Sequence, residues 1–195
     1  MNTFLGAGRN VGPKVVSPSV LHDARITYVE GYCLDTEYSV DSLIAAAEEV
    51  HAGGGRFAIT LSDLFCVDRH RDSFMRLLQG SVDICFGNDD EVKALFETDD
   101  LESALNELEK RCPVVAITSG AQGSILIADG ERVSVRAVSA NVVDTTGAGD
   151  LFAAGVLRGL AAGWPIERCG QMGSRAAGAV ISQMGARLSR QVPSA

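Results

Sequence analysis

The stretch NVVDTTGAGDLFAAGVLRGLAAG, residues Asn141–Gly163, places two glycines and an alanine directly before an aspartate and a long apolar run. Glycine loses more conformational freedom on folding than any other residue, so two glycines at a helix start need a reason. Either the segment is a tight turn in which Asp150 complements the helix dipole, or the backbone is cleared of side chains for an approaching anion.

Outward from this stretch, the chain alternates between strand-like and helical patterns. Two alternating runs about Asp129 and Gly130 form a strong hairpin signal. Long alanine- and glycine-rich helical stretches follow at 150–162 and 167–184. Earlier in the chain, the expected strands are 25–32, 56–62, 82–87 and 113–120, and the expected helices are 41–52, 69–80, 90–97 and 101–111. The alternation predicts an α/β fold with a mostly parallel sheet flanked by helices.

The composition narrows the classes of function. With 195 residues the chain is long enough for one sizeable core, in one or two domains. A net charge of −8 argues against binding to nucleic acid or to an anionic membrane surface, which relies on lysine and arginine. There is no long uncharged apolar run and no signal peptide pattern at the start. The five scattered cysteines form no CxxC pair, which predicts reduced thiols and a cytoplasmic location.

The glycine-rich stretch has two chemical interpretations besides the turn. A dinucleotide site requires a strand and an acidic ribose partner about 20 residues later, but another helical segment follows instead, so this interpretation fails. Phosphoryl transfer requires amides that point at the transferring charge and a base beside them. The amides of Gly147, Ala148 and Gly149 and the carboxylate of Asp150 meet that requirement. The GxxxxGK[ST] motif of P-loop enzymes is absent.

The segment DTTGAGDLFAAG closely resembles the C-terminal signature of the ribokinase-like kinases, also called the phosphofructokinase-B family. The resemblance extends from Met1 to about Leu188, over nearly the whole chain. It implies a ribokinase-like fold in which Gly147, Ala148 and Gly149 form an anion hole and Asp150 is the catalytic base, next to the acceptor substrate. It also implies that Asp144 and Thr146 help to hold a monovalent cation such as K⁺.

Further motifs occur in the order that the family uses. Asn88 and Glu91 match an N-x-x-E motif that helps to organise hydrated Mg²⁺, although the same spacing is also a helix capping box. The T-x-G-x-x-G stretch with Thr118, Gly120 and Gly123 implies a border of the ATP phosphates, and an ordinary strand-to-hairpin turn would look similar. The small residues of 173–186 suit either helix packing or an adenine neighbour, and the candidates there are Ser174 and Ala177.

The front of the chain, in the segments MNTFLGAG, YVEGYCLD and LSDLFCVDRHR, resembles the sugar and adenosine kinase branch found in bacteria. Glu30 is expected to end a strand, where it faces the acceptor or caps the next loop, and Asn2 and Thr3 lie in a segment near the acceptor in that family. Family members are considerably longer at the N-terminus. The expected chain is therefore the C-terminal nucleotide-binding and catalytic part of the kinase domain, residues 1–195, which lacks the N-terminal strands and the lid.

The resemblance implies an ATP-dependent kinase that phosphorylates a hydroxyl of a nucleoside or sugar, with ATP and Mg²⁺ as cofactors. The alternative is a catalytically silent nucleotide-binding fragment of such a kinase. The expected partner is a small-molecule substrate, and the sequence leaves a homodimer open.

Overall fold

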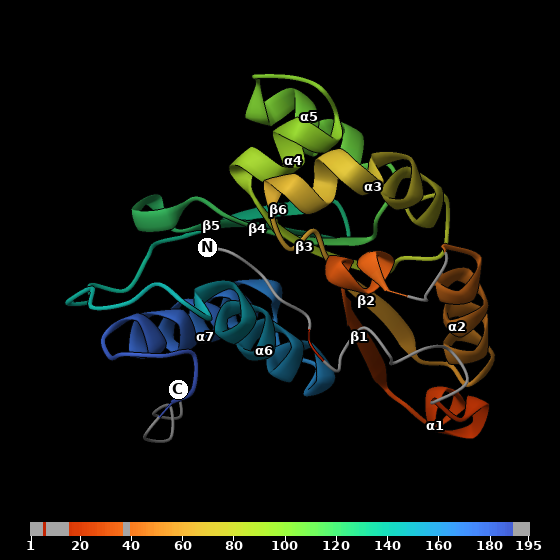
Figure 1. Cartoon of the computed structure of the whole chain (residues 1–195). Helices are drawn as coiled ribbons and strands as arrows, with labels where there is room; N and C mark the ends of the chain where they lie inside the picture. The colour runs from red at the N-terminus through yellow and green to blue at the C-terminus, as the bar shows by residue number, and fades with distance from the viewer. Residues whose placement is uncertain (1–5, 7–15, 37–39, 189–195) are drawn as a thin grey trace. The chain divides into compact units, whose positions relative to one another are not determined.

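The computed structural model describes residues 6, 16–36 and 40–188, so Asn2 and Thr3 lie outside the described residues. The chain divides into two compact units. The first comprises residues 1–86 and 90–112, and the second comprises residues 87–89 and 113–195. Each unit combines strands with helices (Figure 1), which confirms the predicted α/β class.

The first unit is built on parallel strands. β1 (Ile26–Glu30) pairs in parallel with β2 (Arg56–Thr60), and β2 pairs in parallel with β3 (Ile84–Asn88), whose last residues belong to the second unit. Parallel neighbours need long crossover connections, and helices supply them here. The helices of this unit are α1 (Pro18–His22), α2 (Val40–Ala52), α3 (Leu64–Leu77), α4 (Asp89–Leu95) and α5 (Leu101–Glu109), with the 3-10 helix η3 (Gly31–Asp35).

The core of the first unit lies around β2. Phe57, Ala58 and Ile59 are consecutive and all buried, as expected for a parallel strand that is covered on both faces. Phe74 of α3 and Leu43 of α2 are also buried. The apolar runs of the sequence therefore mark the core strands correctly.

Helix α3 begins earlier than the sequence pattern indicated. The predicted helix began at Arg69, whereas α3 begins at Leu64. The Asp63 carboxylate accepts a hydrogen bond of 2.7 Å from the amide of Cys66, which caps the helix start. The backbone at His70 is not helical, and this interruption explains why the periodicity was clear only after it.

The second unit contains an antiparallel group of strands. β4 (Val114–Thr118) pairs with β5 (Ser124–Ala128), and β5 pairs with β6 (Glu131–Val135). Asp129 and Gly130 connect β5 and β6 with φ values of 52° and 76°, as a two-residue hairpin turn requires. The predicted hairpin is thus confirmed. The short 3-10 helix η4 (Gly120–Gln122) lies between β4 and β5.

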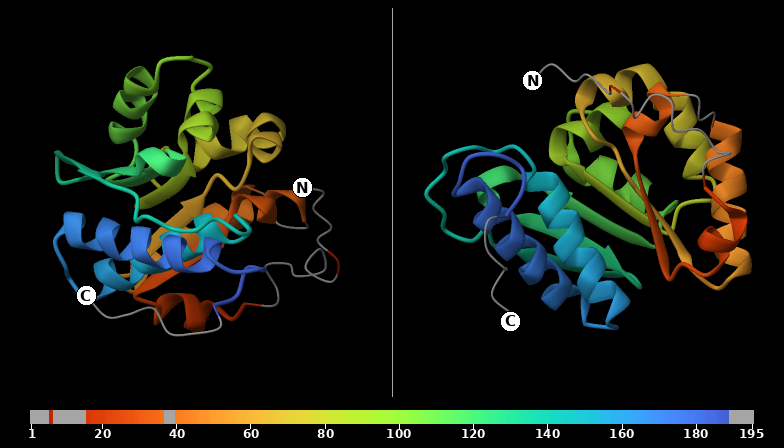
Figure 2. Two further views of the ribbon diagram at one scale, coloured as in Figure 1. Left: turned by 90° about the vertical axis from the view of Figure 1, so that its left-hand side faces the viewer. Right: turned by 60° about the horizontal axis from the view of Figure 1, so that its bottom comes forward.

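Two helices, α6 (Ala148–Ala161) and α7 (Ile166–Ile181), lie side by side in the second unit (Figure 2). A Cβ atom on Gly155 of α6 would lie 2.7 Å from the Cα atom of Gly173 of α7. A Cβ atom on Gly159 would lie 2.6 Å from the Sγ atom of Cys169. Close packing of the two helices therefore accounts for several small residues of this region.

The five cysteines are all free thiols. Burial, with a further contribution from the nearby carboxylates of Asp35 and Asp63, raises the pKa of Cys66 to about 12. Burial likewise raises the pKa of Cys85. These two thiols therefore stay protonated and poorly reactive at neutral pH. No helix in the described ranges is long and apolar enough to cross a membrane.

Candidate functional site

The start of α6 is shaped by Gly147. This residue precedes the helix with φ 81°, a left-handed conformation that glycine adopts without strain. A Cβ atom here would also lie 2.9 Å from the Cβ atom of Ala186. Both the backbone conformation and the close approach of Ala186 therefore favour glycine at this position.

The next residues leave the end of the helix open. Apart from its chain neighbours and the backbone of its own helix, no described residue has a heavy atom within 4 Å of the place that a Cβ atom on Gly149 would occupy, so packing among the described residues does not require glycine there. The amide of Ala148 donates a hydrogen bond of 3.1 Å to the carbonyl of Thr145. Since first-turn amides lack partners inside a helix, the amides of Gly149 and Asp150 are the donors best suited to an anion. The Asp150 side chain is exposed in the same turn.

The loop before Gly147 is braced by Asp144. One carboxylate oxygen of Asp144 accepts hydrogen bonds from the Thr146 amide (2.9 Å) and the Thr146 hydroxyl (2.7 Å). The other accepts from the amide of Gly185 at 2.8 Å. The amide of Val143 donates to the carbonyl of Ile181 at 2.8 Å. The segment that follows α7 thus holds the loop that leads into α6.

These hydrogen bonds keep Asp144 ionised. The Thr146 hydroxyl, the Thr146 amide and the Gly185 amide, in that order, lower the pKa of the Asp144 carboxyl below its ordinary value of 3.8. A carboxylate has about four acceptor positions, of which these bonds use three. Among the described residues, one position therefore remains for a cation, which is compatible with the role that the sequence implied for Asp144 and Thr146.

The lowered pKa predicts a pH-dependent difference between wild type and Asp144→Asn. A depressed pKa stabilises the folded state above the unfolded-state pKa, and this contribution is lost as the pH falls through the folded-state value. Wild type should exceed the variant in urea midpoint at about pH 6, and the gap should close towards about pH 3. The other carboxylates titrate alike in both proteins. An equal gap at both pH values would contradict the assignment.

The turn between β4 and β5 brings Thr118, Gly120 and Gly123 together. The Thr118 hydroxyl donates to the carbonyl of Gly87 at 3.3 Å, so the end of β4 is tied to the residue before Asn88. A Cβ atom on Gly123 would lie 2.1 Å from the carbonyl oxygen of Val135. Gly120 has φ 54°, and apart from its chain neighbours and the backbone of its own short helix, no described residue has a heavy atom within 4 Å of the place of a Cβ atom there. Gly123 is therefore explained by packing, whereas Gly120 is explained by its backbone conformation alone.

The other candidates lie on separate elements of the two units. Asn88 is partly buried at the end of β3, in the second unit, and Glu91 is a buried carboxylate on α4, in the first unit. Ser174 is buried on α7 and Ala177 is partly exposed one turn later. Glu30 is exposed at the end of β1 and makes no capping hydrogen bond to η3. The part of the chain that the structure describes holds no cluster of three metal-binding side chains.

The sequence missed the residues that support the site. Gly185 and Ala186 lie next to Asp144 and Gly147, although they are far from both in the chain. Gly185 has φ 86°, and a glycine in the turn after α7, four residues past its last residue Ile181, is the one signal that pointed to a special conformation there. The arrangement as a whole is a helix N-terminus with open space before it, a braced loop and an exposed carboxylate.

Two solved structures of bacterial proteins are similar to this chain over most of its length. A probable sugar kinase from Rhizobium etli is 43% identical, with a TM-score of 0.94 over 98% of this chain and 59% of that one. An adenosine kinase from Sinorhizobium meliloti is 44% identical, with a TM-score of 0.90 over 94% of this chain and 57% of that one. The chain spans about half the length of the curated relatives it matches, 40% and 53% for the first two.

The fold extends to more distant structures. An Arabidopsis thaliana ribokinase in complex with ribose and ATP is 24% identical, with a TM-score of 0.71 over 87% of this chain and 53% of that chain. This likeness shows the fold alone, and it confirms a ribokinase-like α/β fold with a mostly parallel sheet flanked by helices. The family model for pfkB family carbohydrate kinases matches residues 2–193. The chain therefore belongs to the pfkB family of carbohydrate kinases.

Proposed function

We propose that this chain is the nucleotide-binding and catalytic part of an ATP-dependent kinase that phosphorylates a hydroxyl of a nucleoside or sugar. One observation carries the proposal: an exposed carboxylate, Asp150, lies in the first turn of a helix whose N-terminus has open space at Gly149. Helix N-termini bind anions through their amides and their dipole. The two bacterial structures that are 43% and 44% identical to this chain are a probable sugar kinase and an adenosine kinase.

The residues of the second unit have distinct roles in this proposal. Asp150 accepts the proton of the attacking hydroxyl, and the amides of Gly149 and Asp150, with that of Gly147, stabilise charge on the transferring phosphoryl group. Thr118, Gly120 and Gly123 border the nucleotide, and Ser174 and Ala177 lie near its base. When bound, Mg-ATP supplies the phosphoryl group and a metal ion that neutralises the phosphates.

The metal roles rest on the chemistry of the side chains. Asn88 and Glu91 offer an amide and a carboxylate oxygen, the ligand type that Mg²⁺ prefers directly or through water. Asp144, with one acceptor position left, and Thr146 suit a monovalent cation such as K⁺. The reduced, free thiols support a cytoplasmic location for the protein.

The direct test is a transfer assay. The folded chain is incubated with Mg-ATP and adenosine, ribose or fructose, and the phosphorylated product is measured. Product that depends on Mg-ATP and one acceptor supports the kinase. Mg-ATP binding measured by calorimetry without any transfer would favour the second candidate, a catalytically silent nucleotide-binding fragment, and the absence of both would reject the proposal.

Gly149→Ala separates the chemical role of the anion-binding turn at residues 147–150 from its structural role. Because the Cβ position is open, alanine should fit, and its helix propensity should leave the melting temperature unchanged or raise it. The added methyl group would crowd a phosphate at the helix end, so we expect transfer to fall by about 10- to 100-fold. Ala154→Gly, at an exposed position of the same helix, is the control for backbone effects. Unchanged transfer in Gly149→Ala would contradict the proposal that the turn at residues 147–150 holds the phosphoryl group.

A further inference from the structure

Ser62, between β2 and α3 in the first unit, has a strained backbone. Its φ is 73°, and the amide of Asp63 donates to the carbonyl of Leu61 at 3.0 Å. This bond closes a three-residue γ-turn, and the form with positive φ is the rare, strained one. Two other non-glycine residues in the described ranges have positive φ, but Glu97 ends a helix and Asp129 forms a hairpin turn, where this conformation is common. Neither explanation applies to Ser62.

The hydroxyl of Ser62 is also unusual. Its oxygen is buried and has no hydrogen-bond partner within the described structure, although the residue as a whole is partly exposed. Buried polar atoms without partners are uncommon, and each calls for an explanation. Strain and an unpartnered hydroxyl thus coincide at one residue. Glycine would relieve both, whereas alanine would remove only the hydroxyl.

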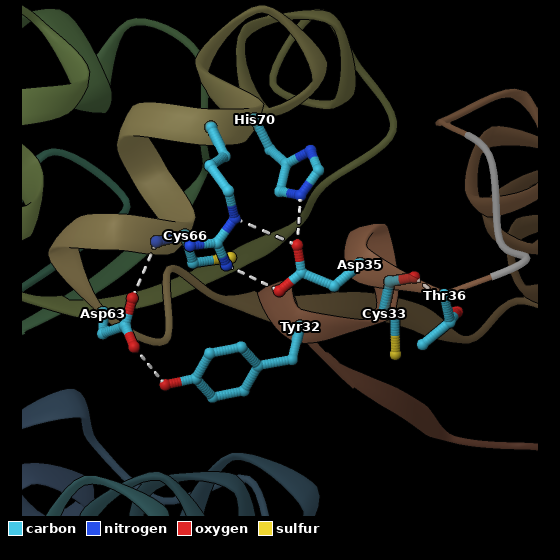
Figure 3. Close-up of polar contacts among 8 residues, drawn as sticks. Tyr32, Cys33, Asp35, Thr36, Asp63, Cys66 and His70 are labelled. Atoms are coloured by element: carbon cyan, nitrogen blue, oxygen red, sulfur yellow. Dashed lines mark hydrogen bonds and ion pairs between the residues drawn. The ribbon is translucent and has the colours of Figure 1, made fainter. Parts of the chain in front are cut away.

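The surroundings hold the turn in place. The amide of Leu61 donates to the carbonyl of Phe86 at 2.9 Å. Asp63 accepts hydrogen bonds from the Cys66 amide and from the Tyr32 hydroxyl of η3 (Figure 3). Strained conformations persist only where neighbouring contacts impose them, and they gather at functional sites.

A second set of hydrogen bonds joins η3 to α3. The Asp35 carboxylate accepts hydrogen bonds from Arg69 at 2.6 Å and from His70 at 2.7 Å (Figure 3). A Cβ atom on Gly31, at the start of η3, would lie 3.1 Å from the carbonyl oxygen of Leu61. Both sides of the Ser62 turn are thus fixed before any ligand arrives.

The position of the turn indicates the kind of ligand. Ser62 follows the carboxyl end of β2, and ligands of open α/β sheets bind outside the carboxyl ends of the strands. Glu30 pairs with Thr60 in the register of β1 and β2, so an exposed carboxylate lies on the neighbouring strand end. With Asp63 nearby, this edge carries negative charge. It disfavours a phosphate group and favours a neutral ligand whose hydroxyls donate to carboxylates.

We propose that Ser62 binds a hydroxyl group of the acceptor substrate. Glu30, on the adjacent strand end, is the residue that the family resemblance already implied near the acceptor. This inference rests on the proposed kinase function and assigns residues of the first unit to binding of the acceptor substrate. Because the residue is partly exposed, we expect a rotation about χ1 to bring the serine oxygen to the surface, where the acceptor would satisfy it. The strained turn fixes the Cβ direction in advance, so little ordering remains to be done on binding.

Calorimetric titration with adenosine and with ribose tests the inference on the full chain. Ser62→Ala should weaken the Kd of the acceptor that binds by about five- to tenfold, the loss of one hydrogen bond. Its melting temperature should be unchanged or higher, since a buried unpartnered oxygen is removed. Ser124→Ala is the matched control, because Ser124 also has a buried, unpartnered hydroxyl but lies in the regular strand β5. It should bind the acceptor as wild type does.

Mg-ATP is titrated into the same proteins, so that two kinds of failure are distinguished. Wild-type acceptor affinity in Ser62→Ala overturns the inference, and so does an equal loss in Ser124→Ala. Mg-ATP binding without acceptor binding by wild type overturns the inference and leaves the nucleotide role intact. If wild type binds neither, the proposed function fails and this inference fails with it.

Discussion

Asp150→Asn is expected to lower the rate of phosphoryl transfer by about 10²- to 10⁴-fold, the range for loss of a positioned general base. Asparagine keeps the size of the side chain but cannot take up the proton of the attacking hydroxyl. The Gly149 and Asp150 amides that would hold the phosphoryl group belong to the backbone and remain. The Kd of Mg-ATP should therefore change little, while kcat falls.

The control for this prediction is Asp129→Asn. Asp129 is an exposed aspartate of the same unit, in a hairpin turn where asparagine is equally suited. It should transfer phosphate at the wild-type rate. Equal rates for wild type and Asp150→Asn would remove Asp150 from the mechanism. An Asp150→Asn protein that no longer binds Mg-ATP would instead show that the carboxylate acts in binding.

Gly155→Val is expected to lower the free energy of unfolding by about 3 kcal/mol or more, which places it among the most damaging single substitutions. The Cβ atom of any side chain at Gly155 would lie 2.7 Å from both the Cα and the amide nitrogen of Gly173. These are backbone atoms of a packed helix, so they cannot rotate away as a side chain would. Relief requires α6 and α7 to separate, which exposes apolar surface on both.

Chemical denaturation measures this effect, with Ala154→Val as the neighbouring control. Ala154 is exposed on the same helix, so valine there costs only its lower helix propensity, below about 1 kcal/mol. Equal losses in the two variants would mean that helix propensity, and not the contact with Gly173, sets the cost.

The sequence predicted the fold well where one physical signal was sufficient. Phe57–Ile59 are consecutive and apolar because β2 is buried on both faces, and Asp129-Gly130 has the conformational freedom that a tight hairpin requires. The start of α3 was missed because its cap, Asp63, stands before an interrupted stretch of helix. The early end of β1 was missed because Gly31 packs against the ring of Phe74, a contact between residues distant in the chain.

The site was predictable only in part for the same reason. The glycines and the aspartate of 147–150 are adjacent in sequence, and their pattern alone indicated an anion site. The support of that site by Gly185 and Ala186 depends on how α7 ends, which no local pattern encodes. The strain at Ser62 is likewise invisible in the sequence, because serine is unremarkable in a loop and the γ-turn arises from contacts on both sides.

The hydrogen bond from the amide of Gly185 to Asp144 makes the proposed site depend on residues that follow α7. Gly185 and Ala186, which follow α7, contact Asp144 and Gly147 and so support the turn at the start of α6. Cleavage or a bulky fusion directly after α7 would disturb these residues. It would therefore alter the turn at 147–150, which we propose binds phosphate, without changing any residue in that turn. Laboratory tags on this protein are therefore better placed away from the end of α7.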